Sequence, residues 1–297
     1  MTSEPGSGVG SDKDPVRCRC SDKPSLPKAG QPPPGASLPF NHCELPAGLL
    51  GSLTFQRHPI PLPLGGVLAL HHRLFAALDQ RPEPSDRLHL FKAHMAAHFS
   101  LEHPEEAGGE APSPQIRTRA NYLRLLRGWS FDSESREGAV LKGWVESRFG
   151  LLTRFHRGPI RDIDDPAHTR FQAERGAGLY GTHALEAQLD LVYTYVQYEL
   201  TRQYPDQTRL TLYRGINGLG QHELLSPIKD HHAVLLLNNL SSFTLNRERA
   251  DEFGDAILEV QIPLAKVFCR HDLLPGMLRG EDEVMVIGGV VEASLSG

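Results

Sequence analysis

The stretch ILEVQIPLAKVFCR, residues 257–270, holds two short apolar runs rich in β-branched residues, Ile257–Ile262 and Val267–Arg270. Runs of this length and composition predict β-strands. Three more runs of the same kind are Leu210–Tyr213, Ala233–Leu237 and Val284–Val291. The chain after Pro205 is therefore predicted to be rich in strands. One helix is expected among them, over Asn246–Phe253, with Asn246 as a possible N-cap and Gly254 as the stop.

The chain before Pro205 is predicted to be mostly helical, because its apolar residues recur at intervals of three and four. The predicted helices cover residues 67–78, 88–99, 120–126, 139–149 and 184–203, and Ser85 and Thr182 are possible caps. A proline-punctuated extended stretch is predicted over residues 55–64, and a loop over residues 102–114.

This order of elements predicts an α+β fold, in which a mostly helical N-terminal part packs on a C-terminal antiparallel β core. Residues 1–37 are dense in Pro, Gly and Ser and contain no aromatic residue, which predicts a disordered tail. Residues 38–204 form the helical region, as part of the same globular unit. Residues 205–297 form the β-rich core.

The bulk composition restricts the class of protein. With 297 residues and 39% hydrophobic residues, the chain can bury a substantial core. A net charge of −5 gives no global electrostatic reason to bind nucleic acid. The apolar runs are far shorter than the roughly 20 residues of a membrane span. The first residues lack the pattern of a secretory signal, and 4 cysteines do not indicate a disulfide framework. We therefore expect a cytoplasmic protein.

Two motifs at strand ends carry groups suited to binding a ligand. Tyr213-Arg214-Gly215 closes the first predicted strand, where a guanidinium suits a phosphate and a glycine permits close approach to the backbone. Ser242 follows the second strand, and its hydroxyl can either bind a ligand or cap the next turn. Taken singly, each has an ordinary structural explanation, since the Arg-Gly pair recurs elsewhere in the chain.

A third motif, Glu281-Asp282-Glu283, precedes the last predicted strand. On an extended segment, Glu281 and Glu283 project from the same face. This pair of carboxylates indicates either a reactive site or a solvated acidic turn.

Together the three motifs resemble those of the arginine–serine–glutamate class of mono-ADP-ribosyltransferases. In that class the first strand ends in an arginine, and the second carries Ser-Thr-Ser and leads into a helix with an alanine and a phenylalanine, as Ala250 and Phe253 do here. The first glutamate of the third motif usually marks enzymes that modify arginine. Phe243 departs from the pattern, because it occupies the middle position of the serine motif and has no hydroxyl.

A longer match, from Leu38 onward, resembles the bacterial NAD–dinitrogen-reductase ADP-ribosyltransferases. It is carried by Leu38–Asn41, Phe55–Pro59, Leu126–Phe149 and Leu240–Phe253. The resemblance implies that residues 205–297 form a split antiparallel core of the ADP-ribosyltransferase type that binds NAD as a co-substrate. It also implies that the acceptor is an arginine of dinitrogenase reductase, the iron protein of nitrogenase, and that modification reversibly inactivates nitrogenase. A PII-type signalling protein is the implied regulator.

The resemblance also implies roles for the motif residues. Glu283 would stabilise positive charge that develops on the ribose, and Glu281 would orient the acceptor guanidinium and take its proton. Arg214 would hold the phosphates, and Gly215 would offer backbone hydrogen bonds to the nicotinamide amide. Ser242 would fix the ribose or the catalytic glutamate.

Two alternative functions use the same residues. One is NAD glycohydrolysis, in which water replaces the acceptor, and the other is a non-catalytic NAD-sensing module on the same fold. No metal is expected. His94 and His98 have the helical spacing of a metal-binding pair, but the sequence indicates no third ligand, and Cys18-Arg-Cys20 has no second cysteine pair nearby.

Overall fold

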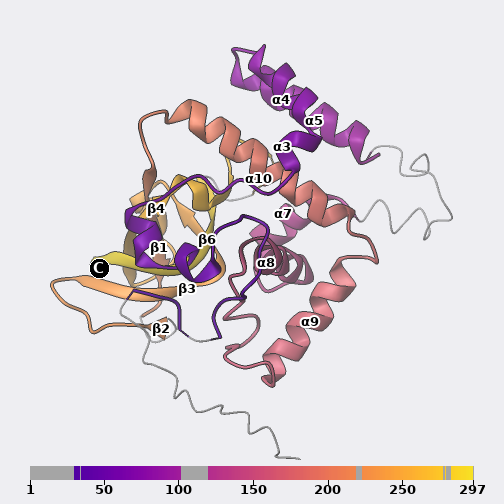
Figure 1. The fold of residues 1–297 in the computed structure, drawn as a ribbon. Coiled ribbons are helices and arrows are strands. Elements are labelled where there is room, and N and C mark those ends of the chain that lie inside the picture. The colour runs from indigo at the N-terminus through magenta and orange to yellow at the C-terminus, as the bar shows by residue number, and fades with distance from the viewer. Residues whose placement is uncertain are drawn as a thin grey trace, which may run out of the picture.

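The protein folds as a layer of helices beside one antiparallel sheet (Figure 1). The computed structural model describes residues 30–33, 35–101, 120–218, 223–276, 278 and 282–296. The helices are α1 (Ala47–Leu50), α2 (Leu53–Arg57), α3 (Val67–Leu70), α4 (His72–Asp79), α5 (Pro84–His98), α7 (Tyr122–Phe131), α8 (Arg136–Phe149), α9 (Pro166–Gly178), α10 (Ala184–Gln203) and α11 (Arg247–Asp251). The strands are β1 (Arg209–Ile216), β2 (Glu223–Leu224), β3 (His232–Thr244), β4 (Ala256–Pro263), β5 (Val267–Arg270) and β6 (Glu283–Ser296), and the 3-10 turn η3 (Leu264–Lys266) separates β4 from β5. The predicted α+β class, with helices first and strands last, is confirmed.

The longest strand, β6, organises the sheet. Strand β3 pairs along one side of β6, whereas β5 and β4 share its other side. Strand β1 pairs with β4 over its whole length and also meets β3, at the single register pair Tyr213 and Thr244. All these pairings are antiparallel. Strands β1 and β3 pair with different neighbours along most of their length. Their one contact therefore brings the ends of these two strands together.

The β3–β6 pair bends sharply at its middle. The register shifts between Leu237 and Leu240, opposite Gly288 and Gly289. A Cβ atom on Gly288 would lie 1.9 Å from the carbonyl oxygen of Asn238, so only glycine fits there. The buried Asn239 donates from its Nδ2 atom to the carbonyl oxygen of Lys142, at 2.8 Å, which ties the bend to α8.

A buried lysine stabilises the same bend from the other side. The Nζ atom of Lys266 donates to the carbonyl oxygen of Gly288, at 2.8 Å, and lies 5.6 Å from the centre of the Phe55 ring. Its side chain is almost fully buried, and this burial lowers the pKa of Lys266 to about 7. The neutral amine is therefore well populated in the folded protein at neutral pH.

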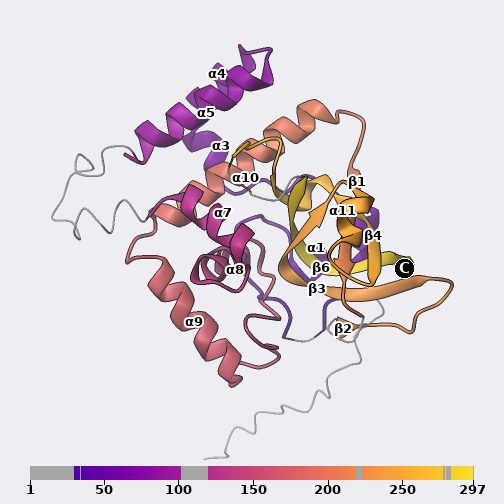
Figure 2. The same cartoon turned by 180° about the vertical axis from the view of Figure 1, so that it is seen from behind.

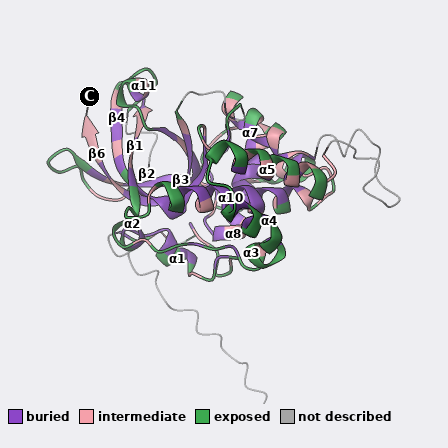
Figure 3. Cartoon of the chain, turned by 90° about the horizontal axis from the view of Figure 1, so that it is seen from above, coloured by how far each residue is buried: buried purple, intermediate pink, exposed green. Residues whose placement is uncertain are grey.

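Helix α10 lies between the sheet and helices α3–α5 (Figures 1 and 2). The hydroxyl oxygen of Tyr193 lies within hydrogen-bond distance of the carbonyl oxygens of Leu62 and Ala265, at 3.1 and 2.8 Å, and its one proton is available to either. One hydrophobic core includes side chains from α10 and from β1, β3, β4, β5 and β6, and much of α10 is buried (Figure 3). The helical and strand-rich parts thus share their core.

Helix α5 is fastened to α10 by a buried ion pair. Arg87 donates from Nε and Nη2 to the two carboxylate oxygens of Glu199, both at 2.7 Å. The Nη1 atom of Arg87 donates to the carbonyl oxygens of Arg81 and Pro82, so the guanidinium is well supplied with acceptors. Because both charged groups are buried and paired, they fix the position of α5 on α10.

Several local predictions are wrong. Residues 55–57 belong to α2 rather than to an extended stretch, because Ser52 caps that helix by accepting from the Phe55 amide. The helix predicted over residues 67–78 breaks at His71 into α3 and α4, and α7 continues to Phe131. Helix α9 was not predicted, because its buried residues are too sparse to give a periodic pattern. The predicted cap of α11 is confirmed: the Asn246 side chain accepts from the amides of Glu248 and Arg249.

The predicted tail covers residues 1–37. Of these residues, the structure describes 30–33 and 35–37. The Gly30 carbonyl accepts from the Leu53 amide at 2.8 Å, and Ala36 is buried. Residues 30–37 thus contact α2 and the core, and residues 1–29 lie outside the described part. None of the described helices is both long and apolar enough to cross a membrane.

The Lys266 amine gives a test of the bend through the pH dependence of stability. The pKa of this amine is about 7 in the folded protein, whereas its ordinary value is 10.5. At pH values between these two, the unfolded chain therefore binds more protons than the folded protein. We expect the free energy of unfolding of the wild type, relative to that of Lys266→Met, to rise as pH increases from about 7 to about 10. Urea unfolding across this range measures the difference, and a difference that falls with pH contradicts a buried neutral amine.

Candidate active site

The candidate active site lies where the C-terminal end of β3 meets the N-terminal end of β6. Residues 241–244 were expected to follow the second strand, but they are its last residues, and Glu283 is the first residue of β6. Thr244 pairs with Glu283, and Ser242 pairs with Met285. This register places the Ser242 hydroxyl beside the Glu283 carboxylate, and Ser242 Oγ donates to Glu283 Oε1 at 2.7 Å.

The third predicted residue reaches this pair from the neighbouring strand. Arg214, on β1, donates from Nη1 to the carbonyl oxygen of Ser242 at 2.8 Å, and its guanidinium lies 6.0 Å from the centre of the Phe243 ring. The structure therefore brings Arg214, Ser242 and Glu283 together, although they are far apart in the sequence. Burial lowers the pKa of Arg214, but a guanidinium keeps its charge at neutral pH.

One buried atom of Arg214 is left without a partner. Within the part of the chain that the structure describes, the N–H group at Arg214 Nε donates to no acceptor and is inaccessible to solvent. A buried charged donor that is not paired is costly, and this cost is removed when an anion provides an acceptor. The site therefore contains a fixed cation whose hydrogen-bonding capacity is incompletely used.

Two further side chains, both from α7, complete the network. Trp129 donates from Nε1 to Ser242 Oγ at 2.9 Å, and Ser130 donates from Oγ to Glu283 Oε2 at 3.1 Å. Sequence reasoning did not single out either residue. They lie inside Leu126–Phe149, a segment of the family resemblance, which was the one available signal. The Glu283 carboxylate thus accepts one hydrogen bond on each oxygen, from α7 and from β3.

Buried polar contacts hold α7 in place beneath the site. The amide of Tyr122 donates to Gln188 Oε1 on α10 at 2.8 Å, and Asn121 caps the helix through the Leu123 amide. Lys142 Nζ lies 5.9 Å from the centre of the Trp129 ring, and burial lowers the pKa of Lys142 to about 8. These contacts fix the direction from which Trp129 reaches Ser242.

The structure gives packing reasons for two residues of the predicted motifs. Phe243 is only 3% exposed and belongs to the hydrophobic core, so it packs in the fold. A Cβ atom on Gly215 would lie 2.1 Å from the carbonyl oxygen of Ala250. Glycine is thus required where α11 approaches β1. This packing requirement is separate from the contact with nicotinamide that the resemblance implies.

Glu281, the other predicted carboxylate, lies outside the described residues. The extended backbone assumed between the two glutamates is wrong, because Asp282 has a left-handed φ of +62°. The strict alternation of side chains therefore does not apply across this tripeptide. Glu281 remains a candidate from its motif alone.

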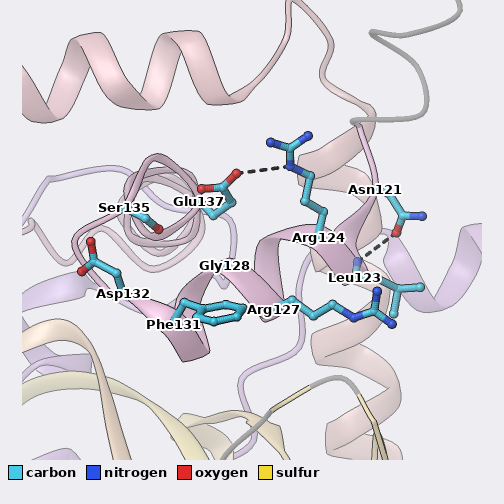
Figure 4. Close-up of a pocket in the computed structure, with 9 residues that line it drawn as sticks. All are labelled: Asn121, Leu123, Arg124, Arg127, Gly128, Phe131, Asp132, Ser135 and Glu137. Atoms are coloured by element: carbon cyan, nitrogen blue, oxygen red, sulfur yellow. Dashed lines mark hydrogen bonds and ion pairs between the residues drawn. The ribbon is translucent and has the colours of Figure 1, made fainter.

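A recess of about 550 Å³ lies beside α7 (Figure 4). It is lined by Asn121, Leu123, Arg124, Arg127, Gly128, Phe131, Asp132, Ser135 and Glu137. None of these nine residues is Arg214, Ser242 or Glu283. However, Gly128 and Phe131 of the recess flank Trp129 and Ser130 in the sequence, so one helix contributes to both places.

An arginine, a serine and a glutamate joined on neighbouring strands of an antiparallel sheet define the arginine–serine–glutamate class of ADP-ribosyltransferases. The chain belongs to the dinitrogenase reductase ADP-ribosyltransferase family, whose model matches residues 40–295. It is 37% identical over 270 residues to the NAD(+)–dinitrogen-reductase ADP-D-ribosyltransferase of Rhodospirillum rubrum, a match that covers 89% of this chain and 98% of that protein. No solved structure shows significant similarity to the chain.

The hydrogen bond from Trp129 to Ser242 gives a test of the network. We expect Trp129→Phe to lower kcat about 5-fold while keeping the ring packed, since one hydrogen bond contributes roughly 1 kcal/mol. The same substitution in a Ser242→Ala background should have almost no further effect. Steady-state kinetics of the wild type, both single variants and the double variant measure the coupling. Additive losses would show that Trp129 acts independently of Ser242.

Proposed function

We propose that this chain transfers ADP-ribose from NAD to an arginine of dinitrogenase reductase, which reversibly inactivates nitrogenase. The observation that carries the proposal is the hydrogen bond from Ser242 Oγ to Glu283 Oε1, formed beside the Arg214 guanidinium. The name of the Rhodospirillum rubrum relative gives the same donor and acceptor protein.

Glu283 is suited to stabilise the transition state of this transfer. Breaking the bond between ribose and nicotinamide develops positive charge on the sugar, which a nearby carboxylate stabilises. The hydrogen bonds from Ser242 and Ser130, at 2.7 and 3.1 Å, hold both oxygens of Glu283 in one orientation. Because the carboxylate is already oriented, little reorganisation is needed as the charge develops.

Arg214 is suited to hold the phosphates of NAD. Its buried Nε atom has no acceptor among the described residues, and phosphate oxygens are strong acceptors for a guanidinium. Ser242 orients Glu283, and the backbone beside Gly215 is our choice for contact with the nicotinamide amide. Glu281 would orient the incoming guanidinium and take its proton as the new bond forms, because that group is not deprotonated in advance at neutral pH.

The acceptor protein has to place an arginine at Glu283, and the recess beside α7 is the surface we assign to that contact. Phe131 is 65% exposed there, next in sequence to Ser130, which contacts Glu283. Exposed aromatic side chains are common anchors in protein interfaces. We further expect a PII-type signalling protein as the regulator and a cytoplasmic location, in keeping with the free thiols of Cys43 and Cys269.

The acceptor contact can be tested separately from the chemistry. We expect Phe131→Ala to raise KM for the acceptor about 10-fold or more, since interface anchors contribute roughly 2 kcal/mol. NAD hydrolysis without acceptor should be unchanged. Leu70→Ala, which alters a residue 71% exposed on α3, is the matched control and should leave both activities unchanged. An unaltered KM for the acceptor in Phe131→Ala would remove the recess from the acceptor site.

The transfer itself is tested by incubating the protein with labelled NAD, ADP, a PII-type protein and purified dinitrogenase reductase. Label should appear on the acceptor and be absent when its target arginine is substituted. We expect Glu283→Gln to lower the rate at least about 100-fold, because it removes the charge that stabilises the transition state. Glu281→Gln should lose transfer but retain hydrolysis of NAD.

The three possible outcomes separate the three functions. Labelled acceptor that depends on Glu283 supports the transferase. Nicotinamide release without labelling would identify a glycohydrolase, and NAD binding without either product would identify a sensor.

A further inference from the structure

A cluster of three histidines lies on α3–α5, away from the strand ends that carry Glu283 (Figure 1). His94 and His98 lie one turn apart on α5, and His71 lies at the junction of α3 and α4. One ring nitrogen from each lies within 4.8 Å of the others. The sequence indicated only the α5 pair, and the fold supplies the third imidazole from 23 residues upstream of His94.

The spacing of these nitrogens suits one metal ion. His71 Nδ1 and His94 Nε2 are 3.2 Å apart. Two imidazoles bound tetrahedrally to zinc at about 2.0–2.1 Å place their nitrogens about 3.3 Å apart. These two ligands thus already have the separation that coordination requires, and a ring nitrogen of the exposed His98 lies within 4.8 Å of a ring nitrogen of each.

The cluster combines a fixed part with an adjustable part. His71 is 5% exposed and His94 is half-buried, whereas His98 is exposed at the last residue of α5. The His71 ring packs edge-on against His98, with centroids 4.8 Å apart, and the His94 and His98 rings are stacked at 5.4 Å. Neutral imidazole is the form that binds metals.

We propose that His71, His94 and His98 bind a zinc ion, which leaves one coordination position open to water or to a fourth ligand. Three imidazoles suit zinc, copper, nickel or iron, whereas calcium and magnesium prefer oxygen ligands. Zinc accepts the tetrahedral geometry that the 3.2 Å separation fits, and it binds without redox chemistry.

The bound ion would add a metal link between segments that meet through side-chain packing and the hydrogen bond between His71 and His94. His71 is where the helix predicted over residues 67–78 breaks, and α5 is held at its other end by the Arg87–Glu199 pair on α10. Zinc at the three histidines would fasten the C-terminal end of α5 to the α3–α4 junction. Its role is structural, and the inference does not depend on the proposed transferase activity.

The test is zinc binding by the full chain, purified without a histidine tag and freed of metal with a chelator. Titration calorimetry and metal analysis after dialysis should give one tightly bound zinc per chain. We expect His98→Ala to weaken binding by more than about 100-fold, beyond the roughly 10- to 100-fold effect of losing an outer-shell partner. His94→Gln should do the same. His89→Ala, which removes an exposed histidine from the same helix, is the matched control and should bind zinc like the wild type.

Two further measurements distinguish a loss of zinc binding from a loss of folding in the variants. Cobalt in place of zinc should give the intense visible absorption of a tetrahedral site in the wild type and in His89→Ala, and none in His98→Ala. Zinc should raise the Tm of the wild type but not that of His98→Ala, whose metal-free Tm should match the wild type because His98 is exposed. The absence of tight zinc binding in the wild type, or equal affinity in His98→Ala, would overturn the proposal.

Discussion

The contact between Gly288 and the Asn238 carbonyl is the constraint on which the sheet and its site depend. It lets the β3–β6 pair bend, because any larger residue at Gly288 would meet that oxygen at 1.9 Å. Beyond the bend, β3 continues until Thr244 meets Tyr213 of β1. At this end of β3 the carbonyl oxygen of Ser242 accepts from Arg214.

The polar groups exposed by the bend are satisfied from the surrounding layers. Asn239 donates to carbonyls of Lys142 and Leu151, and Lys266 donates to the carbonyl of Gly288. Buried backbone carbonyls need such partners, since they have lost contact with water. The helical layer therefore does more than cover the sheet. It provides the donors and acceptors that make an irregular strand pair stable, and through Trp129 and Ser130 it extends into the site.

Much of the fold could be predicted from local patterns. The run Val267–Arg270 coincides with β5, and the Asn246 cap of α11 is present as expected. The end of β3 was misplaced because Asn238 and Asn239 interrupt its apolar run, and local rules treat such residues as a loop. Their side-chain amide nitrogens instead donate to distant backbone carbonyls. No local rule contains this information.

The residues of the candidate site likewise fall into two groups, those that the sequence indicated and those that it did not. Arg214, Ser242 and Glu283 could be selected from their motifs, because each lies at a strand end in a recognisable order. Trp129 and Ser130 could not, since they reach partners 113 and 153 positions away and leave no periodic signal near themselves. His71 was missed for the same reason, since its partners lie in another helix.

The network around Glu283 also orders events during biosynthesis. Its donors come from α7 and β3, and Glu283 follows both of them in the chain, with Ser130 made 153 positions earlier and Ser242 41 positions earlier. A growing chain that ends before Glu283 already contains α7 and β3, but it lacks the carboxylate that their side chains orient. The candidate site is therefore complete only after the helices and strands that support it have been synthesised.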